Sequence, residues 1–293
     1  MAQDLKTILE KITYTDDAQI IKQVTEQLQK VRDRMAKVKR KIAVLSGKGG
    51  VGKSMTTVNL ALALARQGER VGILDVDLNG PCIPRMLGVE GQFKLSPDGA
   101  LPPIGPYDMK IASMDFFLEK GAPVRWKGPM EISPVWLGTQ EMSVIREFLA
   151  DIIWGEIDYL LVDMPPGAAA DKPPVIASFI PELDGAIVVT TASEVALRVV
   201  EKSIYYVRDL GICILGLIEN MSWTRCPKCC DRVSLYEGES EGVCVRTNIP
   251  LLGKVPFDRE MSEGLDRGEI LPADHPIAKQ FDQIAMEIKG RLT

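Results

Sequence analysis

Short apolar runs alternate with stretches of helical character along most of this 293-residue chain. The apolar runs have the length of buried strands and lie at residues 41–46, 70–77, 157–163, 185–191 and 212–220, with a shorter one at 109–114. The intervening stretches are predicted to be helical at residues 54–67, 140–153, 193–210 and 275–292. Strands that alternate with helices indicate βαβ units. We therefore predict an α/β fold, with a mostly parallel sheet covered by helices on both faces.

The N-terminal region has a separate pattern. From Asp17 to Lys39, apolar residues recur at intervals of three and four, which is typical of an amphipathic helix. These residues are Ile20, Ile21, Val24, Leu28, Val31, Met35 and Val38. We predict a helical N-terminal extension over residues 1–37 and one α/β domain over residues 38–293.

Composition narrows the possible function classes. The chain holds 35 basic and 40 acidic residues, a formal net charge of −5, which argues against a nucleic-acid-binding surface or a charged membrane-binding surface. The first residues, MAQDLKTILEK, lack an apolar core followed by a cleavage site, and no run of about 18 apolar residues could span a membrane. Six cysteines without a secretory signal favour a reducing compartment, where thiols stay free. We expect a cytoplasmic protein with neither nucleic acid nor a membrane as its partner.

The sequence GKGGVGKS, Gly47 to Ser54, has the spacing of a phosphate-binding loop, placed after a predicted strand and opening a predicted helix. Glycines in this pattern let successive backbone N–H groups converge on phosphate oxygens, and the helix N-terminus adds positive potential. Lys53 is expected to reach the β- and γ-phosphates, and the Ser54 hydroxyl to ligate Mg²⁺. The expected nucleotide contacts are Gly47, Gly49, Gly50, Val51, Gly52, Lys53, Ser54 and Met55.

Carboxylates at two strand ends complete this predicted site. Asp163 ends the run IDYLLVD, where a carboxylate can hold Mg²⁺ through water. Asp75 and Asp77 end the strand that follows the phosphate motif. Aspartates at strand ends also occur as turn residues, but beside a phosphate-binding loop we expect one of them, Asp77 rather than Asp75, to orient the attacking water. His275 is the only histidine, so we expect neither a histidine base nor a His-rich metal site.

Three of the cysteines lie in RCPKCC, residues 225–230. Thiolates three residues apart suit a soft metal, but structural zinc and Fe–S clusters typically take four ligands. An intrachain zinc site of Cys226, Cys229, Cys230 and Cys244 is one alternative, although adjacent Cys229 and Cys230 would both have to reach one tetrahedral ion. A redox pair is another, although it would normally begin a helix, whereas this segment is predicted to be a loop. A symmetric dimer would supply four thiolates from two C-x-x-C pairs around its two-fold axis.

A second lysine, Lys48, directly follows the first glycine of the phosphate motif. With it, the motif resembles the deviant Walker A of the MinD/ParA/nitrogenase-iron-protein class of P-loop ATPases. Within that class the chain resembles the Mrp/ApbC-type iron–sulfur cluster carriers. The segments that carry this resemblance are SGKGGVGKS (46–54), DVDLNGPCIPRMLG (75–88), DMPPG (163–167), ENMS (219–222), CPKC (226–229) and VPFD (255–258).

The resemblance implies a homodimeric, slowly hydrolysing ATPase that carries an Fe–S cluster to apo-proteins. Lys48 would reach the partner subunit's nucleotide and add positive charge there, as an arginine finger does. Cys226 and Cys229 of each subunit would bridge one [4Fe–4S] cluster. The residues expected to contact adenine are Asn220, Pro256 and Asp258. The expected cofactors are ATP, Mg²⁺ and the cluster, and the expected partners are a second copy of the chain and apo Fe–S proteins.

The chain departs from the family's pattern at several positions. After DMPPG the family usually continues TGD, whereas here Ala168 takes the hydroxyl position and Asp171 lies one place late, a change that bears on the hydrolysis rate. Cys230 stands where glycine is common, and Cys82, where serine is usual, is interpreted as incidental. Cys213, inside an apolar run, is predicted to be a core residue.

An alternative function is that of a spatial-organising ATPase like MinD or ParA, with zinc bridging the dimer through the same four thiolates. That class predicts a membrane-targeting tail or a basic DNA-binding patch, and the C-terminal AKQFDQIAMEIKGRLT is only mildly basic. A nucleotide-gated electron donor like the nitrogenase iron protein would place its cluster cysteines far apart in sequence, which this chain does not do.

Overall fold

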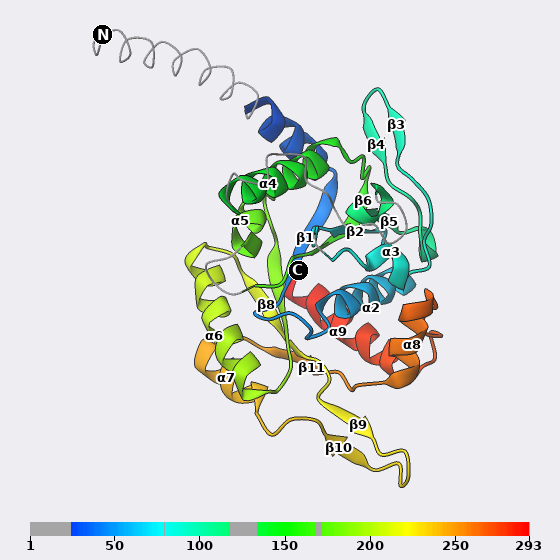
Figure 1. Ribbon diagram of the computed structural model, residues 1–293, viewed down its shortest axis with the longest axis vertical. Helices are drawn as coiled ribbons and strands as arrows, with labels where there is room; N and C mark the ends of the chain where they lie inside the picture. The colour runs from blue at the N-terminus through cyan, green and yellow to red at the C-terminus, as the bar shows by residue number, and fades with distance from the viewer. Residues whose placement is uncertain (1–24, 79, 118–133, 168–171, 293) are drawn as a thin grey trace, which may run out of the picture.

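A parallel sheet of seven strands forms the centre of the protein (Figure 1). The computed structural model describes residues 25–78, 80–117, 134–167 and 172–292. The strands run in the spatial order β11-β8-β7-β1-β6-β2-β5, and each neighbouring pair is parallel. Their bounds are β1 (Val38–Leu45), β2 (Val71–Asp75), β5 (Lys110–Ser113), β6 (Ile157–Asp163), β7 (Gly185–Thr190), β8 (Ile214–Glu219) and β11 (Leu251–Lys254). The predicted α/β fold class is confirmed.

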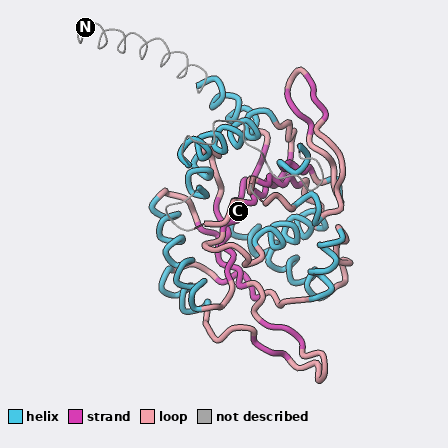
Figure 2. The backbone as a smooth tube through the Cα atoms, viewed as in Figure 1, coloured by secondary structure: helices cyan, strands magenta, loops and turns pink. Residues whose placement is uncertain are grey.

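Helices cover both faces of this sheet, as Figures 1 and 2 show. One layer consists of α2 (Lys53–Arg66), α3 (Ile83–Met86), α8 (Arg259–Arg267) and α9 (Pro276–Leu292). The other consists of α4 (Pro134–Asp151), α5 (Lys172–Ser178), α6 (Glu194–Asp209) and α7 (Ser240–Thr247). Two short 3₁₀ helices, η1 (Pro106–Asp108) and η2 (Met114–Phe117), flank β5. Among the described residues, no helix is both long and apolar enough to cross a bilayer.

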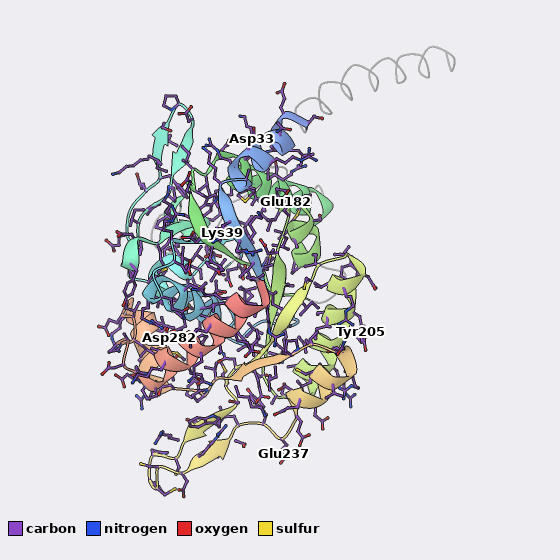
Figure 3. The ribbon with its side chains drawn as sticks, turned by 180° about the vertical axis from the view of Figure 1, so that it is seen from behind. Asp33, Lys39, Glu182, Tyr205, Glu237 and Asp282 are labelled. Atoms are coloured by element: carbon purple, nitrogen blue, oxygen red, sulfur yellow. The ribbon has the colours of Figure 1, made fainter. Side chains whose placement is uncertain are left out.

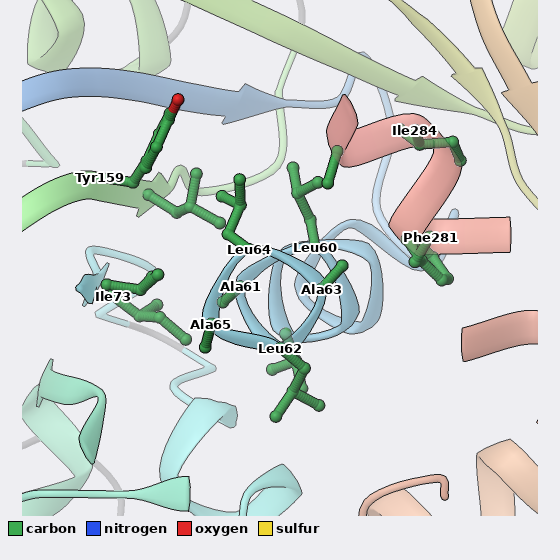
Figure 4. Packing of buried hydrophobic residues seen from close by; sticks show 14 of the residues in the cluster. Leu60, Ala61, Leu62, Ala63, Leu64, Ala65, Ile73, Tyr159, Phe281 and Ile284 are labelled. Atoms are coloured by element: carbon green, nitrogen blue, oxygen red, sulfur yellow. The ribbon is translucent and has the colours of Figure 1, made fainter. Parts of the chain in front are cut away.

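Helix α2 is the central helix of its layer, and Figure 4 shows its packing. Every residue from Thr56 to Ala65 is buried, because the sheet lies on one side of the helix and α9 on the other. Phe281 of α9 is fully buried in this cluster, and burial of one such side chain contributes about 1.5–3 kcal/mol. The packing fixes the start of α2, and with it the predicted phosphate loop, against the centre of the sheet.

The second layer includes the described part of the N-terminal region. A helix runs through residues 25–35, and its Val31 and Met35 are buried in the same apolar cluster as α4. Figure 3 shows this helix, with Asp33, beside the start of β1 at Lys39. The amphipathic helix was predicted to continue to Lys39, which is wrong: β1 begins at Val38, where pairing with Ile157 of β6 replaces the helical turn. The boundary at residue 37 stays a prediction, and residues 1–24 lie outside the described part of the chain.

Two antiparallel hairpins project from this body (Figure 1). One joins β3 (Lys94–Ser96) to β4 (Gly99–Leu101), and the other joins β9 (Trp223–Arg225) to β10 (Arg232–Ser234). The predicted cysteine loop is the tip of the second hairpin. We call residues 223–234 the cysteine hairpin.

Cys213 lies in a different environment from the predicted one. It is exposed, in the segment between α6 and the start of β8 at Ile214. Gly211, with φ of 75°, turns the chain after the helix, and the half-buried side chains of Ile212 and Ile214 make the core contacts at this end of the strand. The prediction of a core residue is therefore wrong.

Candidate functional site

The predicted phosphate loop, Gly47 to Ser54, connects the central strand β1 to helix α2. Gly52 caps the N-terminus of α2 with φ of 82°, a left-handed conformation that residues other than glycine rarely adopt. A Cβ at this position would also lie 2.1 Å from Asn220 Nδ2. The loop thus places backbone N–H groups and the positive end of a helix at the carboxyl edge of the sheet, the usual place for phosphate in α/β proteins.

Asp163, at the end of β6, accepts three side-chain hydrogen bonds from α2. Lys53 Nζ and Ser54 Oγ donate to Oδ2 at 2.7 and 2.6 Å, and Thr57 Oγ1 donates to Oδ1 at 2.6 Å. Asp163 is fully buried and Lys53 nearly so, so each charge offsets the other in a region poor in water. Ser54 Oγ and Asp163 Oδ2 are hard oxygen donors that converge beside a lysine, and this donor set fits Mg²⁺ with a nucleotide phosphate.

Asp75 is a second buried carboxylate, on the strand next to Asp163 in the sheet. It accepts hydrogen bonds from Ser113 Oγ at 3.0 Å and from the backbone N–H of Asp77 at 3.2 Å. Burial, followed by the charge of Asp163, raises the pKa of Asp75 to about 7, and Lys53 opposes this shift. Asp77 itself is half-buried two residues further on. The Asp75 carboxylate thus holds the backbone that follows β2, and the water-orienting role of Asp77 stays a prediction.

Cys82, interpreted from the sequence as incidental, lies beside this carboxylate cluster. Its backbone N–H donates to Asp75 Oδ2 at 3.2 Å, and its thiol contacts the Ser54 side chain. Burial, and then the charge of Asp75, raises the pKa of the Cys82 thiol to about 11. The neutral thiol thus borders the predicted phosphate site.

Asn220 follows β8 and contacts the phosphate loop directly. Its Nδ2 donates to the carbonyl oxygen of Val51 at 2.8 Å, while its Oδ1 is buried and accepts no hydrogen bond from the protein. A buried carbonyl oxygen without a donor costs about 1–3 kcal/mol, so a ligand N–H at this position would stabilise the protein. Adenine carries such an amine. Among the other residues predicted at adenine, Pro256 is buried, and Asp258 caps α8 through a 2.8 Å hydrogen bond from the Met261 N–H.

The remaining predicted loop residues differ in exposure. Lys48, Gly49 and Gly50 are exposed, whereas Val51 is buried and Met55 is half-buried against the core. The ammonium of Lys48 therefore lies on the outer surface of the loop. The segment with Ala168 and Asp171 lies outside the described residues.

The cysteine hairpin has a short and defined tip. The Cys226 N–H donates to the Asp231 carbonyl at 2.8 Å, and the Cys230 N–H donates to the Cys226 carbonyl at 2.9 Å. The Arg232 guanidinium lies over the Trp223 ring, 4.4 Å from its centroid, a cation–π contact that joins the two strands below the tip. These contacts define the short loop between Cys226 and Cys229.

Backbone amides of the tip point toward a thiol. The pKa of the Cys226 thiol is lowered mainly by a hydrogen bond from the backbone N–H of Cys229. The backbone N–H of Lys228 and then the Cys229 side chain contribute further. Cys229 and Cys230 are exposed, and Cys226 is partly so. Cys230 has φ of 61°, in the left-handed region that residues other than glycine rarely adopt. The tip is an exposed loop that stabilises thiolate.

The intrachain four-cysteine alternative is not formed. Cys244 is buried on α7 among Val188, Leu197 and Val243, away from the exposed tip. Within the described part of the chain, no three Cys, His, Asp or Glu side chains are grouped so as to hold a metal ion. The redox-pair alternative would place the cysteines at a helix N-terminus, and they lie instead between β9 and β10.

Three residues of the phosphate site were missed from the sequence: Thr57, Ser113 and Cys82. Thr57 lies three residues after Ser54 on one helix face, a spacing that could have indicated it. Ser113 reaches Asp75 only because β5 pairs with β2. Cys82 reaches it because the segment between β2 and α3 turns back toward the end of β2. The short β9 and β10 strands, of three residues each, offered no alternating pattern.

Known proteins with similar sequences form a consistent group. Residues 37–289 match the family model described as NUBPL iron-transfer P-loop NTPase, of the ParA type. The iron-sulfur cluster carrier protein of Saccharolobus solfataricus is 41% identical over 280 residues, covering 92% of this chain and 90% of that protein. The cytosolic Fe-S cluster assembly factor NUBP1 homolog of Caenorhabditis briggsae is 37% identical over 273 residues, covering 90% and 84%.

Solved structures agree on the fold. A nucleotide-binding protein from Archaeoglobus fulgidus in complex with ADP, in which cobalt was found, has a TM-score of 0.72 and 33% identity, covering 86% of this chain and 95% of that one. The cell division ATPase MinD of Pyrococcus furiosus has a TM-score of 0.59 at 21% identity, covering 86% and 99%. The second likeness concerns the fold alone.

Proposed function

Because this chain belongs to the ParA-type family of iron-transfer P-loop NTPases, we propose that it is a homodimeric, ATP-binding carrier that delivers an Fe–S cluster to apo-proteins in the cytoplasm. Each subunit contributes Cys226 and Cys229 to one [4Fe–4S] cluster. The observation that carries the proposal is the exposed, thiolate-stabilising hairpin tip on a chain that also has a complete phosphate loop. The names of the relatives support the same cargo.

The proposed nucleotide site uses the carboxyl edge of the sheet. Backbone N–H groups of Gly49 to Lys53 and the Lys53 ammonium hold the phosphates. Ser54 and Asp163 hold Mg²⁺, which supplies positive charge at the β- and γ-phosphates when bound. The Asn220 Oδ1 atom accepts from the adenine amine, and Pro256 and Asp258 line the base.

Slow hydrolysis transfers the γ-phosphoryl group of ATP to water. Asp77 orients that water, and the exposed Lys48 reaches the nucleotide of the partner subunit, where it offsets negative charge that develops on the phosphates. The half-buried position of Asp77 and the outward position of Lys48 suit these roles. ATP thereby favours a face-to-face dimer, and the state of the nucleotide sets how firmly the cluster is held.

Two thiolates are too few for a cluster, so the site needs a second copy. Fe–S clusters typically take four cysteine ligands, and a two-fold axis that passes the hairpin tip doubles the pair. The half-exposed apolar side chains of Val233 and Leu235 lie on and beside the same hairpin, and they suit contact between two hairpins. The acceptor is an apo-protein with vacant cysteine ligands.

Anaerobic reconstitution with iron and sulfide tests the proposal. We expect about four irons per dimer and a brown chromophore in the wild type, and loss of both in the Cys226→Ser, Cys229→Ser double variant. Cys213→Ser is the control, because Cys213 is also an exposed cysteine but lies outside the hairpin. A colourless protein that holds zinc, or iron retained by the double variant, would contradict the proposal and favour a zinc-pinned ATPase switch.

A further inference from the structure

The cysteine hairpin is part of an excursion that leaves the sheet after β8 and returns at α7 (Figure 1). One side chain joins the two ends of this excursion. Glu219, the last residue of β8, accepts a hydrogen bond from Ser240 Oγ at the start of α7. The two residues are 3% and 0% exposed, so the bond closes the base of the excursion inside the protein.

A lysine from a third element completes this clamp. Lys254 Nζ, at the end of β11, lies 3.6 Å from Glu219 Oε2 and 2.6 Å from Glu241 Oε1. A buried carboxylate without a cation is strongly destabilising, so Lys254 makes the position of Glu219 possible. We call Glu219, Ser240, Glu241 and Lys254 the base clamp.

Backbone bonds fasten the hairpin to the segment that follows Lys254. The Ser222 N–H donates to the Val255 carbonyl at 3.0 Å, and the Phe257 N–H donates to the Trp223 carbonyl at 2.7 Å. Pro256 lies between these two contacts. The hairpin therefore rests on the same segment that carries the predicted adenine contacts.

The other neighbour of the clamp is the phosphate loop. Asn220 directly follows Glu219 and holds the Val51 carbonyl, with its own Oδ1 buried and unpaired. Met221, with φ of 53°, then turns the chain into the hairpin. This conformation costs a non-glycine residue about 1 kcal/mol, and it persists because Asn220 and Ser222 are both fixed by hydrogen bonds. Two residues thus separate a nucleotide contact from the first residue of β9.

We propose that Glu219 is a positioning residue that makes the phosphate loop and the cysteine hairpin one mechanical unit, so that nucleotide at Asn220 changes the exposure of the Cys226 thiol. The inference deepens the proposed function and rests on its assignment of nucleotide and thiolates. When adenine binds, its amine donates a hydrogen bond to Asn220 Oδ1, so that both the oxygen and the nitrogen of this side-chain amide have partners. Because Glu219 precedes Asn220 and belongs to the base clamp, this restricts the motion of the hairpin. A variant that weakens the base clamp should uncouple the nucleotide site from the hairpin without removing a contact to nucleotide or to the Fe–S cluster.

Alkylation of metal-free protein tests this directly. Iodoacetamide labelling of Cys226, followed by peptide mass spectrometry, is compared with and without Mg-ADP. ADP is chosen because it lacks the γ-phosphate that Lys48 of a second subunit would reach. We expect Mg-ADP to slow labelling of wild-type Cys226 by about fivefold, the lower end of usual coupling between sites.

Two variants and two controls separate coupling from damage. Glu219→Gln and Ser240→Ala should each abolish most of the ADP effect while ADP affinity stays within about twofold of wild type. Ser240→Thr, which keeps the hydroxyl, and Glu201→Gln, which breaks the Glu201–Arg246 ion pair between α6 and α7, should retain the effect. Ser240→Ala changes no charge, so it decides the question if Glu219→Gln does not fold.

Three results would overturn the inference. They are an unchanged ADP effect in Glu219→Gln and Ser240→Ala, the absence of any ADP effect in wild type, and a loss of ADP affinity in proportion to the loss of protection. None of these measurements needs iron. A failure here is therefore distinct from a failure of the reconstitution experiment, which concerns the cluster itself.

Discussion

At the scale of single residues, the predicted phosphate site contains two buried carboxylates, each of which accepts hydrogen bonds from neighbouring groups. Asp163 is held by three donors from α2, and Asp75 by Ser113 and backbone N–H groups. Adjacent carboxylates on neighbouring strands repel one another, and Lys53 between them offsets part of that repulsion. Mg²⁺ and nucleotide would therefore bind beside two buried carboxylates and a lysine whose charges already offset one another in part.

The raised pKa of Asp75 predicts a pH dependence of stability. Its folded value of about 7 lies above its ordinary value of 3.8, so the folded state keeps a proton that the unfolded state releases between these values. This contribution to stability is complete below about pH 4 and is lost as the pH rises to 7, on the order of 4 kcal/mol at about 1.4 kcal/mol for each unit of difference. Asp75→Asn should remove the decline, as urea unfolding at pH 5 and pH 8 would show.

A matched control for this prediction is Asp209→Asn, at an exposed position at the end of α6. It should leave the pH profile of the wild type unchanged. If Asp75→Asn loses as much stability between pH 5 and pH 8 as the wild type does, the decline comes from other groups and the assignment to Asp75 is wrong.

Among residues, sequence reasoning found those whose role is local. Lys53 and Ser54 follow from spacing alone, and Asp163 from its place at the end of an apolar strand. Ser113 could not be found this way, because its contact with Asp75 depends on which strand pairs with β2. The contact of Cys82 depends on how the segment after β2 turns back toward Asp75. The contact of Glu219 with Ser240 could not be predicted from the sequence either, because the two residues are 21 positions apart and come together only when the hairpin has folded.

At the scale of elements, the cysteine hairpin and helix α8 both start from segments predicted to contact ligand. Short strands of three residues carry no alternating pattern, so the hairpin was predicted only as a loop. The β1 boundary and Cys213 show the same limit, since pairing with β6 and the turn at Gly211 decide where each strand begins. Long apolar strands and α2 were predicted because burial imposes a pattern on the sequence itself.

The α8 cap gives a prediction at this scale. Asp258 Oδ1 accepts from the Met261 N–H and caps the helix. Asp258→Ala should lower the free energy of unfolding by about 1 kcal/mol, the usual value of an N-cap, whereas Asp258→Asn should retain nearly all of it. Urea unfolding measures both, and ADP titration of the Asn variant separately reports whether the carboxylate contacts the nucleotide. Equal destabilisation by Asn and Ala would contradict the capping role.

At the scale of the whole molecule, the nucleotide site and the cysteines lie on one folded body but at different places. The alternation of strands and helices was sufficient to predict the fold, whereas the family was predicted from the resemblance of the motifs and their order. The distance between sites could not be predicted. In the structure, the excursion from β8 to α7 joins them through residues 219–223. Under the proposed function, this connection couples release of the cluster to the state of the nucleotide.

The most direct test of the carrier function is transfer of the cluster. Reconstituted protein is mixed anaerobically with the apo form of a [4Fe–4S] enzyme such as aconitase, in the presence of an iron chelator that captures free iron. If the protein is a carrier, acceptor activity returns in proportion to the cluster supplied, despite the chelator, and the Cys226→Ser, Cys229→Ser variant restores none. Iron that stays on the donor, or acceptor activity that the chelator abolishes, would contradict it.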